Sequence, residues 1–201
     1  MTELERWERR FEAPGYVFGT EPNAFLKSKA HLLKPGQKAF TLADGEGRNG
    51  VWLAEQGLDV HSIDISPKGI AKARALAAER GVKLSTEQGD LATWTWPTSA
   101  YDVIVGIFFQ IWFPPERARI FAGIKQALRP GGLLLMQNYR TDQLKYRTGG
   151  PPEVERLYTR ALLEEWFGDF SSIDIKEYDA MISEGTGHVG MSALIDLVAR
   201  K

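Results

Sequence analysis

The sequence contains no cysteine, and this absence excludes several kinds of chemistry at once. Disulfide bonds, thiolate zinc sites, iron–sulfur ligation and cysteine nucleophiles all need a residue that the chain does not have. Histidine is also scarce: the 3 residues, His31, His61 and His188, are scattered without the spacing of a metal-binding motif. We therefore expect no metal site.

A strong charge imbalance and long apolar runs are absent too. The 201 residues include 25 Lys+Arg and 26 Asp+Glu, a net charge of -1 that argues against a dedicated nucleic-acid binder. The most apolar stretch, residues 103–109, is far shorter than the roughly 20 residues that cross a bilayer. The charged start, residues 1–10, lacks the apolar core of a secretory signal. These features predict a cytoplasmic protein with no nucleic-acid and no membrane partner.

The chain does contain a regular alternation of strand-like and helix-like segments. Strands are predicted at 38–43, 60–64, 82–88, 101–107 and 133–138, and helices at 48–56, 67–80 and 115–128. Helical segments at 2–12 and 22–33 precede them, and strand candidates at 172–182 and 192–199 follow. This order predicts an α/β fold: a doubly wound, Rossmann-like, mostly parallel sheet with helices on both faces. We expect a single domain over 1–201, with its last strand antiparallel and 1–33 as an N-terminal helical extension.

A glycine-rich turn follows the first predicted strand. Gly45, Gly47 and Gly50 give the pattern GxGxxG, and Asp64 ends the next strand near the roughly 20-residue spacing expected of a ribose-binding acid. A plain tight turn capped by Asn49 is the alternative. The strand–turn–helix context and the acid together favour a nucleoside cofactor.

The charge of this turn discriminates between nucleoside cofactors. A helix N-terminus favours phosphate, but Asp44 flanks this turn and Glu46 sits between its glycines. Each carboxylate would oppose a nearby diphosphate by about a few kcal/mol at an effective dielectric near 20. S-adenosylmethionine (SAM) has no phosphate and carries a cationic sulfonium. The acidic turn therefore favours SAM over NAD(P).

Further motifs follow in order: FTLADGEGRN at 40–49, GDL at 89–91, YDVIV at 101–105 and LRPGG at 128–132. Together they resemble the class I SAM-dependent methyltransferases over most of the chain. More narrowly, FGTEPNAFL at 18–26 and GEGRN at 45–49 resemble the tellurite-resistance (TehB-type) and thiopurine methyltransferase-like branch. Members of that branch methylate small, soft sulfur, selenium or tellurium nucleophiles, and an N-terminal segment folds over the cofactor, here residues 1–33.

The resemblance implies a cofactor site. It assigns Asp64 to the ribose hydroxyls and Asp90 to the adenine amino group. The implied cofactor contacts are Ala43, Asp44, Gly45, Glu46, Gly47, Asn49, Asp64, Ile65, Asp90, Leu91, Gly106 and Ile107.

The chain departs from the family pattern at two positions. Thr41 stands where the family carries an acid, and Ala43 stands where it carries a glycine. Either Asp44 takes over the role of the missing acid through a shifted geometry, or this chain binds SAM more weakly than members of the family that carry the acid. Ala43 fits the turn if its φ is negative.

Two residues are candidates for catalysis. His188 is the candidate acid or base and lies in a glycine-rich stretch that we expect to be a flexible turn; an exposed or loop-packing histidine is the alternative. Tyr139 ends the fifth predicted strand, either as a pocket wall or as a core-edge aromatic.

Aromatic residues are the candidates for an acceptor site or lid: Tyr16, Phe18, Phe108, Trp112 and Tyr146. Each has the alternative of ordinary packing. Arg48 and Arg74 are expected to be solvated surface charges.

The sequence thus predicts an enzyme, a SAM-dependent methyltransferase that acts on a small-molecule acceptor and releases S-adenosylhomocysteine. A soft thiolate acceptor needs no base in the site. The alternatives are an NAD(P)-binding oxidoreductase and a non-catalytic SAM-binding protein. No sequence feature indicates an oligomeric state.

Overall fold

One seven-stranded sheet runs through the structure, a computed structural model that describes residues 1–201. Its strand order is β3-β2-β1-β4-β5-β7-β6. The strands are β1 (Lys38–Leu42), β2 (Asp59–Asp64), β3 (Ser85–Gln88), β4 (Tyr101–Ile107), β5 (Leu128–Tyr139), β6 (Ser172–Glu184) and β7 (His188–Arg200). The five strands from β3 to β5 are parallel, and β7 runs antiparallel to both β5 and β6. The predicted fold class and the antiparallel last strand are confirmed.

The helices connect and cover these strands. They are α1 (Glu3–Phe11), α2 (Ala24–Ser28), α3 (Arg48–Glu55), α4 (Pro67–Glu79), α5 (Pro114–Ala127), α6 (Gln143–Tyr146) and α7 (Arg160–Phe167), with short 3-10 turns η1 (Ala30–Leu32) and η2 (Val154–Arg156). No helix is both long and apolar enough to cross a membrane.

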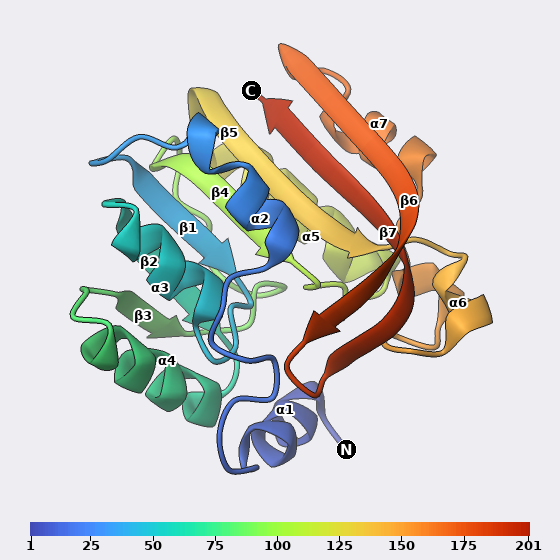
Figure 1. The fold of residues 1–201 in the computed structure, drawn as a ribbon. Coiled ribbons are helices and arrows are strands. Elements are labelled where there is room, and N and C mark those ends of the chain that lie inside the picture. Colours follow the sequence, from blue (N-terminus) through green and yellow to red (C-terminus); the bar gives the residue numbers. More distant parts are fainter.

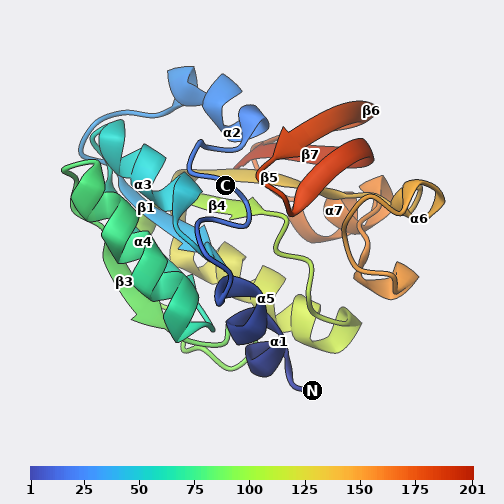
Figure 2. The ribbon, with the colours of Figure 1, turned by 60° about the horizontal axis from the view of Figure 1, so that its bottom comes forward.

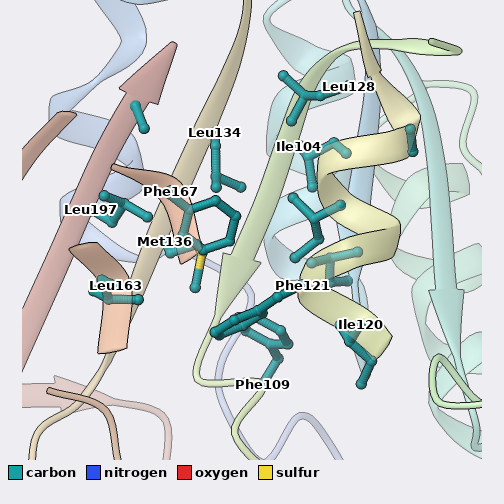
Figure 3. Close-up of a cluster of buried hydrophobic side chains, with 14 of the residues drawn as sticks. Ile104, Phe109, Ile120, Phe121, Leu128, Leu134, Met136, Leu163, Phe167 and Leu197 are labelled. Carbon is teal, nitrogen blue, oxygen red and sulfur yellow. The ribbon is translucent and has the colours of Figure 1, made fainter. Parts of the chain in front are cut away.

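The helices form two layers around the sheet. Figure 2 shows α2, α3 and α4 on one face, with α5 and α7 on the other. Phe25 of α2 and Leu53 of α3 pack on Val105 of β4 in one buried cluster. On the opposite face, Phe121 of α5 and Phe167 of α7 pack on strand side chains such as Leu134 and Met136 in a larger cluster (Figure 3). Burial on both faces explains the almost uninterrupted apolar sequence of the central strands.

The predicted helix at 22–33 is instead a short α2 followed by the separate turn η1. Asn23 begins α2 by accepting the N–H of Leu26. At its other end, the hydroxyl of Ser28 donates to the carbonyl oxygen of Phe25 at 2.7 Å. Serine hydroxyls compete in this way with the helical hydrogen bonds of the backbone, and the helix ends there.

The glycine-rich stretch before the last strand is a tight hairpin, not the flexible turn that the sequence predicted. β6 and β7 are each 13 residues long and pair from Ser172 with Arg200 to Glu184 with His188. Gly185 has φ of 61°, a conformation that glycine adopts without strain. His188 is therefore the first residue of a strand, and its position is fixed by the sheet.

Candidate functional site

A cavity of about 760 Å³, its mouth included, lies at the carboxyl ends of β1, β2 and β4. This edge is where open α/β sheets bind ligands, and α1 lies across it (Figure 1). The apolar lining residues are Trp7, Phe11, Phe18, Leu42, Ala43, Ile63, Ile65, Leu91, Val105, Ile107, Phe108, Phe109, Ile111 and Trp112; the others are Thr41, Asp44, Arg48, Asn49, Asp64, Gly89 and His188. We call it the edge cavity.

The glycine turn shapes one end of the edge cavity. Gly45 and Gly47 have φ of 58° and 87°. A Cβ atom on Gly47 would lie 2.5 Å from the Cβ of Ala73, so glycine is required for α4 to pack this closely. A Cβ atom on Gly45 would lie 3.0 Å from the ring of Phe11. Neither glycine lines the cavity. Both shape the backbone of the turn that borders it.

Ala43 does not meet the condition under which we expected it to fit the turn, a negative φ. Its φ is 47°, in the left-handed region that costs an alanine roughly 1–2 kcal/mol. The hydrogen bonds of the turn impose this geometry: the N–H of Asp44 donates to the carbonyl of Ile63 at 3.2 Å, and the carbonyl of Asp44 accepts from Gly47 at 3.0 Å. Ala43 therefore carries the strain that the family's glycine avoids.

Asp44 contacts the first turn of α3. Its Oδ2 accepts hydrogen bonds from the N–H of Gly50 and the hydroxyl of Ser62, both at 3.1 Å. Burial raises the pKa of Asp44 to about 7, because these donors offset only part of the lost hydration of the charged form. Whether Asp44 takes over the role of the family's acid stays a prediction.

Asp64 joins the end of β2 to the glycine turn. Its Oδ2 accepts from the N–H of Gly45 at 2.7 Å, and its Oδ1 accepts from the N–H of Ser66 at 2.8 Å. Burial raises the pKa of Asp64 to about 6 despite these donors. A carboxylate has about four acceptor positions, so Asp64 can hold the turn and still accept from a ligand in the edge cavity.

Glu46 does not face the edge cavity, which corrects one part of the charge argument. It is buried, its Oε1 lies 2.8 Å from the Nζ of Lys72, and its Oε2 accepts from the N–H of Val17 at 2.8 Å. The lysine neutralises it, so it does not oppose a phosphate in the cavity. The negative charge that favours a cationic ligand comes from Asp44 and Asp64.

Two of the expected cofactor contacts lie beside the edge cavity without lining it. Asp90 accepts from the Nε1 of Trp112 at 3.3 Å and so orients that indole, while its neighbour Leu91 lines the cavity. Gly106 faces the ring of Phe109, and a Cβ atom there would lie 2.6 Å from it. Both residues act on the cavity through an aromatic side chain that lines it.

The expected cofactor, lid and catalytic residues divide into those that line the edge cavity and those that do not. The expected residues that line the edge cavity are Ala43, Asp44, Asn49, Asp64, Ile65, Leu91, Ile107, Phe18, Phe108, Trp112 and His188. Tyr16 instead donates its hydroxyl to the carbonyl of Lys72, and Tyr146 donates to Asp179. Asn49 is no helix cap: it lies inside α3, and its Oδ1 accepts from the N–H of Asn23.

Arg48 is a site residue that the sequence argument placed on the surface. It is buried, lines the edge cavity, and its Nη2 lies 2.6 Å from the Oε2 of Glu184 at the end of β6. Its partner lies 136 residues away in the sequence. One local feature of the sequence indicated a site role for Arg48: it directly follows the glycine turn and is the first residue of α3.

His188 is buried between two aromatic rings, so it is not an exposed histidine. Its ring centroid lies 4.6 Å from that of Phe18 and 4.4 Å from that of Phe108. Burial lowers the pKa of the imidazole, and the nearby Glu184 carboxylate offsets only part of this effect. The side chain is therefore neutral at pH 7.

A second cavity, of about 550 Å³, adjoins the edge cavity. Trp7, Phe108, Ile111 and His188 line both. The remaining lining residues are Arg6, Arg10, Gln110, Tyr139, Gly149, Gly150, Pro151, Arg156 and Gly187. We call it the arginine cavity. Tyr139, predicted as either a pocket wall or a core-edge aromatic, is almost fully buried and lines this cavity.

Comparison with known proteins places the chain in a family. Residues 40–132 match the family model described as "Methyltransferase domain". Over 125 residues, 61% of this chain, the sequence is 32% identical to a phosphoethanolamine N-methyltransferase of Triticum aestivum, of which the chain spans 23%. A structure from work on the conversion of a disulfide bond into a thioacetal group during echinomycin biosynthesis superposes with a TM-score of 0.75 and 17% identity, covering 100% of this chain and 93% of that one.

The sheet order, the glycine turn, the edge cavity and these matches agree: residues 40–132 form a methyltransferase domain, and the chain is similar to the class I SAM-dependent methyltransferases. A TehB protein shares this fold. The crystal structure of TehB from Haemophilus influenzae superposes with a TM-score of 0.69 and 20% identity, covering 98% of this chain and 66% of that one. The cofactor of this class is SAM.

The edge cavity fits this cofactor. Two buried carboxylates, Asp44 and Asp64, have raised pKa values, which means that the site lacks enough positive charge to stabilise their ionised forms. A cationic sulfonium compound supplies that charge. The aromatic rings of Trp7, Phe11 and Trp112 in the lining suit a cation or a purine ring.

Proposed function

We propose that this chain transfers a methyl group from SAM to a small-molecule acceptor with a soft nucleophile, such as a thiol or selenol. The observation that carries the proposal is the meeting of the two cavities at His188 and Phe108. A cofactor in the edge cavity and an acceptor in the arginine cavity would meet at that junction. The solved neighbour concerned with a disulfide and a thioacetal is consistent with sulfur as the acceptor atom.

The residues of this chain mainly provide alignment and a dry site. SAM supplies, when bound, a methyl group on a cationic sulfur, and transfer to a thiolate leaves neutral S-adenosylhomocysteine and a methyl thioether. Asp64 orients the glycine turn and would hold the ribose hydroxyls of the cofactor, while Trp7 and Phe11 would exclude water from the cavity. Alignment of the reacting atoms and exclusion of water are established sources of rate enhancement.

His188 is the only titratable side chain that lines both cavities. Because its imidazole is neutral at pH 7, it can accept the proton of an acceptor that enters as a thiol. An acceptor that enters as a thiolate needs no such step. Residues 1–33 supply the cover in part: 3–18 lie over the edge cavity, whereas α2 packs on the sheet. A cytoplasmic location stays a prediction.

The first test is cofactor binding by the wild-type chain and by Asp64→Asn. We expect calorimetric titration to show binding of S-adenosylhomocysteine and none of NADH, because Asp44 and Asp64 oppose a diphosphate. Asp64→Asn should weaken binding by about 10-fold or more, since a hydrogen bond to a charged group contributes roughly 1.5–3 kcal/mol. The control is Asp59→Asn, an exposed carboxyl on the same strand.

Equal affinity of the wild-type chain and Asp64→Asn would disprove the ribose assignment. Binding of NADH in preference to S-adenosylhomocysteine would favour the oxidoreductase alternative. Cofactor binding without methyl transfer to any thiol or selenol would favour the non-catalytic alternative.

A further inference from the structure

Three arginines converge on the arginine cavity from two parts of the chain. Arg6 and Arg10 are one turn apart on α1, and Arg156 ends η2. The neighbouring residues on α1, Trp7 and Phe11, line the edge cavity. Residues four apart share a helix face, so one row of α1 faces the cofactor site and the adjacent row faces the arginine cavity.

Two of these arginines are paired with a carboxylate and the third is not. Glu3 lies 3.6 Å from Arg6 and 3.1 Å from Arg156, and Glu153 lies 3.7 Å from Arg156. Arg10 is half-buried, yet it has no ion pair within 4.0 Å and no side-chain hydrogen bond. Its guanidinium instead lies over the rings of Trp7 and Phe18, at 5.5 and 4.9 Å from their centroids.

The other side of the arginine cavity holds a buried hydroxyl group without a partner. The hydroxyl of Tyr139 has no hydrogen bond, and the tyrosine is 1% exposed. A Cβ atom on Gly149 would lie 2.9 Å from this hydroxyl, which places it beside a glycine that lines the cavity. The Nδ1 of His188 instead faces the carboxylate of Glu184, whose Oε2 lies 3.9 Å away. Buried donors in native proteins are normally satisfied, so the Tyr139 hydroxyl is free to donate to a group that enters this cavity.

We infer that the arginine cavity binds an anionic group of the methyl acceptor, a carboxylate or a phosphate, through Arg10 and the hydroxyl of Tyr139. An unpaired guanidinium presents planar, charged donors that match such a group. Three arginines line the cavity, and two carboxylates, Glu3 and Glu153, pair with two of them. These five side chains together carry one net positive charge. The inference rests on the proposed function, and it narrows the acceptor to a soft nucleophile that also carries an anion.

The test uses small probes and one matched pair of variants. Arg10→Met removes the unpaired charge, and Arg9→Met removes the same charge from an exposed position on α1. Propionate and inorganic phosphate are titrated into the complex with S-adenosylhomocysteine. We expect one of them to bind the wild-type chain and Arg9→Met alike, and to bind Arg10→Met about 10- to 100-fold more weakly. The preferred anion distinguishes a carboxylate acceptor from a phosphate acceptor.

Transfer is measured separately with 3-mercaptopropionate and 2-mercaptoethanol, which differ in the anionic group. We expect a higher kcat/KM for the carboxylate thiol in the wild-type chain and in Arg9→Met, with the preference lost in Arg10→Met. If neither thiol is methylated while anion binding still depends on Arg10, the thiol acceptor is wrong and the anion site stands. Anion binding that is absent from the wild-type chain, or unchanged by Arg10→Met, would overturn the assignment.

Discussion

Asp44 lines the edge cavity and also affects the stability of the fold. Burial raises the pKa of its carboxyl from 3.8 to about 7. Between these values the folded chain holds a proton that the unfolded chain has released, so the contribution of Asp44 is fully present below pH 4 and is lost as the pH rises through 7.

We therefore predict that Asp44→Asn flattens the decline in stability between pH 4 and 7. The asparagine oxygen can still accept from Gly50 and Ser62, but it carries no charge. At pH 8 the variant should be more stable than the wild-type chain by up to about 3 kcal/mol, a figure reduced because the side chain keeps some contact with solvent in the cavity. Urea unfolding at pH 4.5, 6 and 8 measures this. The exposed Asp59→Asn is the control, and an unchanged pH profile in Asp44→Asn would contradict the prediction.

Single residues also show where sequence reasoning ended. The identities of Gly47 and Asp64 indicated the turn and the acid, because their chemistry depends on the adjacent strand and helix. The positive φ of Ala43 and the burial of Arg48 depend on partners that are distant in the sequence, such as Ile63 and Glu184. No local pattern contains that information.

At the scale of elements, the segment after α1 is held to the glycine turn by one lysine. The Nζ of Lys72 on α4 donates to the carbonyls of Ala13 and Gly15 at 2.8 and 2.6 Å, and to Glu46 at 2.8 Å. Glu46 in turn accepts from the N–H of Val17. The position of the cover over the edge cavity therefore depends on a side chain from a different helix.

We predict that Lys72→Met loosens this segment. The change leaves the buried Glu46 without a cation and frees two carbonyls, so the amide of Val17 should exchange with solvent about 10- to 100-fold faster. Lys68→Met is the matched control on α4, because its ammonium pairs only with Glu12, where both side chains are largely exposed. Hydrogen exchange followed by NMR gives the rates. Equal rates in the two variants would argue against the lysine as the anchor.

Most elements could be predicted from the sequence because their signals are periodic and local. The strands from 38 to 107 and the helices at 48–56 and 67–80 lie within a few residues of their predicted bounds. The exceptions have local competitors: Ser28 ends α2 early, and the N–H of Val82 bonds to the carbonyl of Ala77, which delays β3 until Ser85. Both strands of the β6–β7 hairpin were predicted, but the tight turn and the early start of β7 were missed because the turn residues are typical of a flexible loop.

Over the whole molecule, Glu184 connects three regions. It pairs with Arg48 of α3, accepts from the side chain of Asn23 at 2.9 Å, and lies at the tip of the β6–β7 hairpin. Burial alone would raise the pKa of Glu184, but His188 and the Arg48 guanidinium together lower it to about 2. Its contribution to stability is therefore present above pH 4.5 and is lost as the pH falls toward 2.

We predict that Glu184→Gln lowers the free energy of unfolding at pH 7 by about 3 kcal/mol, since it leaves a buried arginine without its counter-ion. Glu177→Gln, on the same strand, is the control: its pair with Arg160 is solvent-exposed and should contribute less than about 1 kcal/mol. Chemical denaturation of both variants gives the values. A loss no larger than that of the control would show that the pair contributes little.

The contact between the two ends of the chain has a consequence for protein synthesis. The carbonyl of Val17 accepts from the N–H groups of Thr186 and Gly187 at 2.8 and 2.9 Å. Figure 1 shows the tip of the β6–β7 hairpin beside α1. A ribosome makes residue 17 long before residue 187, and N-terminal regions generally begin to fold first. Because His188 lines both cavities, neither cavity has its full lining until the hairpin has been made.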